Sequence, residues 1–380
     1  MSHPTVVGAV AARCDNAVMT YVPATADELT ADYLADLIEL PVTAVETTII
    51  GTGEGFVGQL ARLALSYDDG APSDAPASLI AKLPTADPGG RFIGEMLRLW
   101  EREGRWYREV APSITVRVPR CYANLADTGD SRYLLVLEDL APSRPGDQVV
   151  GASAEQAYRV LGDIARFHAQ WWMHPMLEQL DWMPKIDDPT TKMVTPMFAQ
   201  GWPAFHERFK DVLSARTLDW VERFGPTCAD FLDLYADEPV TMIHGDFRLD
   251  NMMFGDDGDI ALIDWQMSTR APALSDFVYF VGTNLTDAVR RDHLGGLLHH
   301  YATTLASGGV AVPPEEELMD GVRKGILMWM VAMAGGIGQL DPANERGVRL
   351  FDAIITRLFH CGDDIDAGQF LDQWLAQWKG

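Results

Sequence analysis

The chain has 380 residues, which is enough for a large core and for two lobes or domains. Its composition, 47% hydrophobic and 22% charged, is that of a globular protein rather than a disordered one. The formal net charge of -25 argues against nucleic acid as a partner, because phosphates require a positive protein surface.

Membrane and secretion signals are missing from the sequence. No apolar run reaches the roughly 18 residues that suggest a membrane span, and Gly325 to Gly338 indicates a buried helix instead. The first residues lack the basic start and apolar run of a signal peptide. Four scattered cysteines without a C-x-x-C pair disfavour a zinc site and fit a reducing compartment. We therefore expect a cytoplasmic protein without a membrane span.

The first part of the chain combines a helix with short strands. Helical spacing of apolar residues predicts a helix over 27–40, ended by Pro41. Strands are predicted over 42–50 and 60–67, on either side of a glycine-rich stretch. In a Rossmann fingerprint such glycines would lead into a helix instead. Glycines let backbone N–H groups approach a phosphate, so Gly53, Gly55 and Gly58 are candidates for a phosphate-covering loop.

A lysine and a glutamate are the charged candidates that follow. Lys82 is the one charged residue in an apolar strand predicted over 78–84, although an edge-strand lysine is the alternative. A single helix is predicted over 88–110, and its inward face carries Glu103 together with Phe92, Met96, Leu99, Trp100, Trp106 and Tyr107. Because a buried carboxylate needs a partner, we expect Glu103 to pair with Lys82. The alternatives, expected to be solvated, are Glu95, Glu101 and Glu109.

A lobe boundary is predicted near residue 140. Strands over 120–125 and 132–137 lead into Glu138-Asp139-Leu140, and a Pro/Gly-rich stretch follows over 141–146. Beyond it the sequence is largely helical, beginning with a helix over 154–172 for which Ser153 is the N-cap. Further amphipathic helices are predicted over 294–305, 315–334 and 344–360. We therefore predict an N-terminal domain over 1–140 and a C-terminal domain over 141–380.

The most informative stretch runs from Ile243 to Gln266. Two apolar runs, 252–254 and 260–263, flank a turn rich in Asp and Gly, which predicts a β-hairpin. A hairpin brings its ends together, so Asp246 and Asn251 before it should meet Asp264 after it. Oxygen-bearing side chains of this kind suit Mg²⁺, which shares its shell with phosphate and water.

The spacing His244-x-Asp246-x4-Asn251, followed by Asp264 in Ile-Asp-Trp-Gln, matches the kinase catalytic-loop signature. On these motifs the chain resembles the aminoglycoside phosphotransferase and choline kinase superfamily. Protein kinases usually have Arg at the position of Gly245, so the small-molecule branch fits better. Within it, residues 138–140 and the Glu103-x-x-Trp106-Tyr107 helix are most similar to the ecdysteroid-kinase-like group.

The resemblance implies a bilobal α+β fold like that of protein kinases, with an antiparallel N-lobe sheet plus a helix and a mainly helical C-lobe. It implies ATP and Mg²⁺ as cofactors and a small-molecule hydroxyl as phosphate acceptor. Asp246 would take the acceptor proton, supported by His244, while Asn251 and Asp264 would bind the metal. Lys82, braced by Glu103, would bind the phosphates, and the backbone at Glu138 and Leu140 would contact adenine.

Alternatives to this interpretation remain open. A hydrophobic alcohol is the acceptor that the ecdysteroid-kinase-like resemblance favours, and an aminoglycoside or other antibiotic is the alternative. A pseudokinase that binds nucleotide as an interaction module is a hypothesis of another class. The full set Lys82, Asp246, Asn251 and Asp264 argues against it. The oligomeric state and the role of 185–192 are not indicated.

Overall fold

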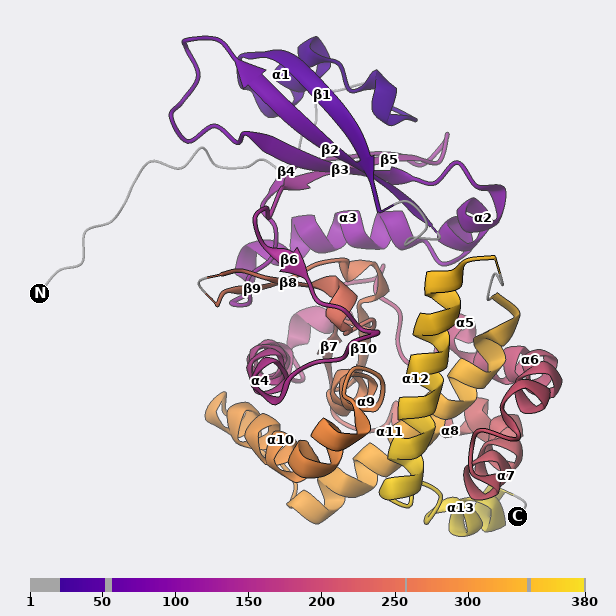
Figure 1. Cartoon of the computed structure of the whole chain (residues 1–380). Helices are drawn as coiled ribbons and strands as arrows, with labels where there is room; N and C mark the ends of the chain where they lie inside the picture. The colour runs from indigo at the N-terminus through magenta and orange to yellow at the C-terminus, as the bar shows by residue number, and fades with distance from the viewer. Residues whose placement is uncertain (1–20, 52–56, 257, 340–342, 379–380) are drawn as a thin grey trace, which may run out of the picture. The chain divides into compact units, whose positions relative to one another are not determined.

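The computed structural model describes residues 21–51, 57–256, 258–339 and 343–378 (Figure 1). The chain divides into two units, Met1–Ser113 with Val118–Ala141 and Ile114–Arg117 with Pro142–Gly380. The predicted residues Gly53 and Gly55 lie outside the described part. None of the helices described has the length and apolar content needed to cross a lipid bilayer.

The first unit is built on a five-stranded antiparallel sheet of order β1-β2-β3-β5-β4. Its strands are β1 (Val42–Ile50), β2 (Gly58–Tyr67), β3 (Ser78–Pro84), β4 (Cys121–Asp127) and β5 (Arg132–Glu138). The helices α1 (Ala31–Ile38) and α3 (Leu99–Glu109) lie on opposite sides of this sheet in Figure 1. The predicted strands are therefore confirmed, and the sheet has one helix against each face.

The side chains of β3 alternate between the two faces of the sheet, and this determines which helix each of them faces. Leu79, Ala81 and Leu83 are buried in the core cluster that includes α1. Side chains on a strand alternate between faces, so Lys82 points to the other face, where α3 packs. A single lysine can thus belong to an otherwise apolar strand without entering the apolar core.

The single helix predicted over 88–110 is wrong. The structure has α2 (Pro88–Met96) and α3, separated at Arg98, whose φ of 54° lies in the left-handed region. This residue ends the regular hydrogen-bond ladder and changes the direction of the chain. Phe92 and Met96, expected to be inward, are consequently 67% and 54% exposed, whereas Glu103 is buried as predicted.

The second unit is mainly helical and contains two small sheets. The sheets pair β7 (Val240–Ile243) with β10 (Thr269–Pro272), and β8 (Met252–Phe254) with β6 (Arg144–Pro145) and β9 (Ile260–Leu262). The β8–β9 hairpin confirms the sequence prediction. The β7–β10 pair was not predicted, because its strands are short and separated by the whole catalytic stretch.

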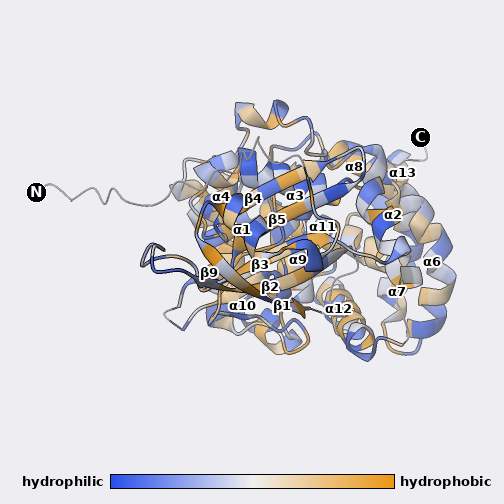
Figure 2. Ribbon diagram, turned by 90° about the horizontal axis from the view of Figure 1, so that it is seen from above, coloured by the Kyte–Doolittle hydropathy of each residue, from blue (hydrophilic) through white to orange (hydrophobic). Residues whose placement is uncertain are grey.

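Helices make up most of the rest of this unit. They are α4 (Ala154–Trp171), α5 (Pro189–Lys192), α6 (Val194–Phe209), α7 (Ala215–Phe224), α8 (Cys228–Tyr235), α9 (Leu274–Thr283), α10 (Asp287–Ser307), α11 (Glu315–Gly335), α12 (Glu345–Asp364) and α13 (Leu371–Trp378). Ser153 begins α4 with a complete capping box, as predicted. Hydrophilic and hydrophobic residues alternate along helices such as α12 in Figure 2, as expected where one face is buried.

Candidate active site

Two strand pairs bring the two halves of the predicted catalytic stretch side by side. Ile243 at the end of β7 pairs with Thr269 at the start of β10, and Met252 pairs with Leu262 in the hairpin. The loops 244–251 and 263–268 are thus held together at both ends. Gly245 has a φ of 83°, and a Cβ atom there would collide with the carbonyl of Met267, so the two loops also touch next to the β7–β10 end.

Hydrogen bonds across the two loops position Asp264. His244 is buried, and its Nε2 lies 3.0 Å from the carbonyl oxygen of Ile263. The N–H of Ile263 donates to the carbonyl of Asn251 at 3.0 Å. Asp264 follows directly, with a φ of 63°. His244 therefore helps to hold the two loops together. Asp264 directly follows Ile263, the residue that hydrogen-bonds to Asn251.

Asp246 is held at one carboxylate oxygen. Its Oδ2 accepts hydrogen bonds from Nε of Arg248 at 3.0 Å and from Nδ2 of Asn251 at 2.9 Å. Burial by itself raises the pKa of this carboxyl, but the charges of Arg248 and His244 and these hydrogen bonds outweigh burial, so the pKa lies below its ordinary value. The side chain remains 25% exposed, so an ionised carboxylate is accessible to a ligand.

Asn251 and Asp264 offer hard oxygen donors. Because Nδ2 of Asn251 donates both to the carbonyl and to the carboxylate of Asp246, its Oδ1 is the acceptor atom that it can offer to a cation. Among the residues that the structure describes, no three His, Cys, Asp or Glu side chains group as an all-protein metal site would require. Magnesium usually takes one or two protein ligands and completes its shell with phosphate and water, so this pair fits it.

A buried polar network supports the loop from beneath. The carboxylate of Asp276 accepts the backbone N–H groups of His244 and Gly245, and it lies 3.1 Å from Nε2 of His168. Nδ1 of His168 in turn lies 2.6 Å from the hydroxyl of Tyr301. All of these groups belong to the second unit, and they fix the backbone on which Asp246 is carried.

Two neighbours of Asp246 were missed by the sequence reasoning. Arg248 is one, and Tyr279 on α9 is the other; burial, together with the nearby Asp246 carboxylate, raises the pKa of the Tyr279 hydroxyl. The ring of Tyr279 packs against Trp329 with centroids 4.4 Å apart. The spacing Asp246-x-Arg248-x-Asp250 and the i, i+3 relation of Asp276 to Tyr279 were signals that could have pointed to them.

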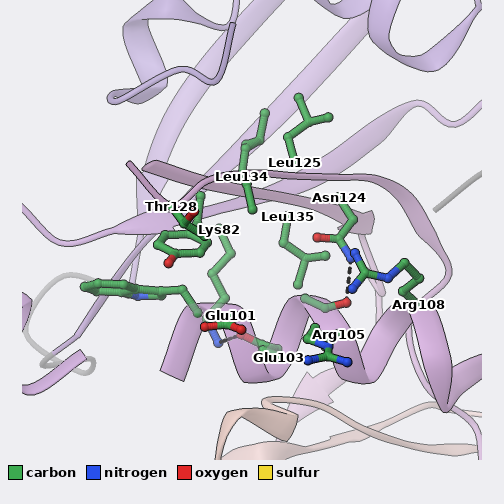
Figure 3. Close-up of a pocket in the computed structure, with 14 residues that line it drawn as sticks. Lys82, Glu101, Glu103, Arg105, Arg108, Asn124, Leu125, Thr128, Leu134 and Leu135 are labelled. Atoms are coloured by element: carbon green, nitrogen blue, oxygen red, sulfur yellow. Dashed lines mark hydrogen bonds and ion pairs between the residues drawn. The ribbon is translucent and has the colours of Figure 1, made fainter. Parts of the chain in front are cut away.

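In the first unit, Lys82 and Glu103 form an ion pair. Nζ of Lys82 lies 2.6 Å from Oε2 of Glu103, and the two side chains are 11% and 3% exposed. Figure 3 shows the lysine reaching from the sheet toward α3. The pair borders a cavity of about 300 Å³ between α3 and strands β4 and β5, whose walls include Trp100, Tyr133 and Leu135. Gly58 lies against the Lys82 side chain.

The segment expected to contact adenine is anchored within the same unit. The backbone N–H of Glu138 donates to the carbonyl of Arg120, and its carboxylate accepts the N–H of Arg120 at 2.9 Å. The neighbouring Asp139 accepts hydrogen bonds from Arg62 and Ser78 at 2.7 Å each. Leu140 follows β5 and is half-buried. The adenine contact at Glu138 and Leu140 stays a prediction.

The sequence model of the ecdysteroid kinase-like family matches residues 52–308, and the chain belongs to this family. The resemblance found in the sequence is thereby confirmed, and the protein is a small-molecule phosphotransferase of the kinase-like type. No curated protein matches the chain in sequence.

Solved structures of several phosphotransferases are similar to this chain. A spectinomycin phosphotransferase bound to ADP and spectinomycin is 14% identical, with a TM-score of 0.56 over 91% of this chain and 99% of that one. Its AMP complex gives a TM-score of 0.50 at 14% identity, over 89% and 99% of the two chains. A macrolide 2'-phosphotransferase from Brachybacterium faecium is 17% identical, with a TM-score of 0.49 over 87% and 97%. The spectinomycin phosphotransferase complexes confirm the predicted kinase-like α+β fold.

Proposed function

We propose that this protein transfers the γ-phosphoryl group of ATP to a hydroxyl of a small molecule, with Mg²⁺ as the metal. The observation that carries the proposal is the placement of Asp246, Asn251 and Asp264 on two loops that hydrogen bonds and two strand pairs hold together. This arrangement supplies a proton acceptor and two oxygen donors for a cation on two adjoining loops.

Asp246 is the group that takes the proton. Its lowered pKa keeps it ionised near neutral pH, so it can accept a hydrogen bond from the acceptor hydroxyl. The acceptor oxygen then forms a bond to the γ-phosphorus while the bond from that phosphorus to the bridging oxygen breaks. The departing ADP keeps the electron pair, and the hydroxyl proton passes to Asp246. Correct positioning and charge neutralisation supply most of the rate in such a transfer.

Oδ1 of Asn251 and the carboxylate of Asp264 are the groups that would hold Mg²⁺. When bound, the metal neutralises phosphate charge and orients the triphosphate. The amide of Gln266 lies 3.4 Å from Oδ2 of Asp264 and helps to fix the orientation of that carboxylate. Asn251 is fixed in the same way by its two hydrogen bonds to Asp246.

The first unit would bind the nucleotide through Lys82. Its ammonium group is a compact cation suited to phosphate oxygens, and Glu103 keeps it oriented. Gly58, with the residues before it, would cover the phosphates. Leu140 and Glu138 would offer backbone groups to adenine. We keep 1–140 and 141–380 as the proposed functional domains, and the cytoplasm as the proposed compartment.

The acceptor that we favour is a hydrophobic alcohol. The family is named for kinases of ecdysteroids, which are steroid alcohols. The paired rings of Tyr279 and Trp329 give the surroundings of Asp246 an apolar wall. An aminoglycoside is the competing class, since one neighbour of known structure is a spectinomycin phosphotransferase.

The proposal is tested by measuring ADP release from ATP and Mg²⁺ with a panel of alcohols that includes a steroid, choline and spectinomycin. We expect turnover with at least one of them, and loss of that turnover in Asp264→Asn. Asp256→Asn is the control: it changes an exposed aspartate in the turn of the β8–β9 hairpin and should keep wild-type turnover. Wild-type turnover in a correctly folded Asp264→Asn variant would refute the metal assignment.

A further inference from the structure

Arg248 touches the proposed proton acceptor, and the function proposed above gives it no role. Its Nε donates to Oδ2 of Asp246 at 3.0 Å, and its Nη1 donates to Oδ2 of Asp250 at 3.3 Å. The side chain is 22% exposed. It is therefore a cation that bridges two carboxylates and still reaches solvent at the point where the reaction would occur.

The geometry of a guanidinium group leaves one edge available for a ligand. In a planar guanidinium, Nε–H and one N–H of Nη2 point in parallel from the same edge. Nε–H of Arg248 points to the carboxylate of Asp246. The parallel N–H of Nη2 therefore points in the same direction, alongside that carboxylate. Nη2 of Arg248 donates no hydrogen bond to the residues that the structure describes. The N–H of Nη2, adjacent to Asp246, is thus a hydrogen-bond donor that a ligand can accept.

Arg248 is also held rigidly. Oδ1 of Asp250 accepts the backbone N–H of Gln148 at 3.1 Å, so the carboxylate that accepts the hydrogen bond from Nη1 is itself fixed. The next backbone N–H, that of Leu249, donates to Oδ1 of Asn284 at 2.9 Å. A donor fixed in advance needs no reorganisation when charge develops on a ligand, and such donors contribute most to stabilising a transition state.

We propose that Arg248 is a catalytic residue whose Nη2 donates to a non-bridging oxygen of the phosphoryl group during transfer. This inference rests on the proposed function. An acceptor hydroxyl hydrogen-bonded to Asp246 places its oxygen, and hence the phosphorus that it attacks, beside the guanidinium edge. As the bond to ADP breaks and the new P–O bond forms, Arg248 neutralises the charge spread over the phosphoryl oxygens and gives up no proton.

The experiment compares binding of ADP alone with binding of ADP and aluminium fluoride, both with Mg²⁺, by calorimetry. Aluminium fluoride imitates the phosphoryl group in transit, so only the second complex reports the proposed contact. Arg248→Ala should bind ADP as the wild type does and should bind ADP with aluminium fluoride at least about 10-fold more weakly. Arg248→Lys, which keeps the charge without the parallel N–H groups, should show the same selective loss.

Two controls separate a catalytic role from a structural one. Arg291→Ala removes a half-exposed arginine paired with Asp364 and should behave as the wild type. Added guanidinium ion should restore part of the turnover of Arg248→Ala, because it can occupy the vacated space. An equal loss of affinity for both complexes, or no loss for either, overturns the inference. A wild type that does not prefer the aluminium fluoride complex overturns the proposed function as well.

Discussion

Oδ2 of Asp276 accepts a hydrogen bond from the backbone N–H of His244 at 2.7 Å. Oδ1 of the same carboxylate accepts the N–H of Gly245 at 3.0 Å, so one buried side chain on α9 satisfies two consecutive backbone donors of the catalytic loop. Unpaired buried donors are costly, which makes this carboxylate a structural support for Asp246.

Replacing Asp276 by Ala should destabilise the protein and impair turnover together. Two backbone N–H groups and Nε2 of His168 would lose their acceptor, at a cost of about 3 kcal/mol in the free energy of unfolding. Urea denaturation followed by circular dichroism measures this change. A loss below about 0.5 kcal/mol, typical of surface substitutions, would contradict the role given to Asp276.

The Lys82–Glu103 pair should contribute to stability mainly through the cost of breaking it. Lys82→Met removes the cation from a carboxylate that is only 3% exposed, so we expect a loss of about 3 kcal/mol. The double variant Lys82→Met/Glu103→Met removes both charges and should recover most of that loss. Neither variant should phosphorylate an acceptor at a measurable rate.

Denaturant titrations of the two variants measure their free energies of unfolding, with the wild type as reference. Equal stability of the single and double variants would show that the buried carboxylate does not depend on Lys82. Recovery of stability without recovery of turnover would show that the pair is retained for its chemistry rather than for folding.

The thiols of Cys228 and Cys361 should resist alkylation in the native protein. Burial raises the pKa of each to about 12, since the charged thiolate is disfavoured away from water. At pH 8 the reactive thiolate is then about one part in 10⁴. Iodoacetamide labelling followed by peptide mass spectrometry should find both unmodified until the protein is unfolded. Rapid labelling of either under native conditions would contradict its burial.

Local signals in the sequence were sufficient to predict those helices and strands whose own residues specify them. The β8–β9 hairpin follows from its Asp-Gly turn, and α4 follows from Ser153 and a regular apolar stripe. Glu103 was placed correctly because its helical neighbours Trp106 and Tyr107 are bulky and buried.

Contacts between distant residues were the part that could not be predicted. The break at Arg98 depends on how α2 and α3 pack rather than on a Pro or Gly at that position. The β7–β10 pair joins segments separated by the whole catalytic stretch, and no local pattern specifies such a pairing. The contacts of Asp246 with Tyr279 and Arg248 likewise depend on the folded loop.

The central claim is that Asp246 takes the proton of an acceptor hydroxyl during phosphoryl transfer from ATP. The most direct measurement is the turnover of Asp246→Asn with the best acceptor found for the wild type, alongside the affinity for ATP. We predict that turnover falls by about 10²–10⁴-fold while ATP affinity is retained. Turnover equal to that of the wild type would contradict the account.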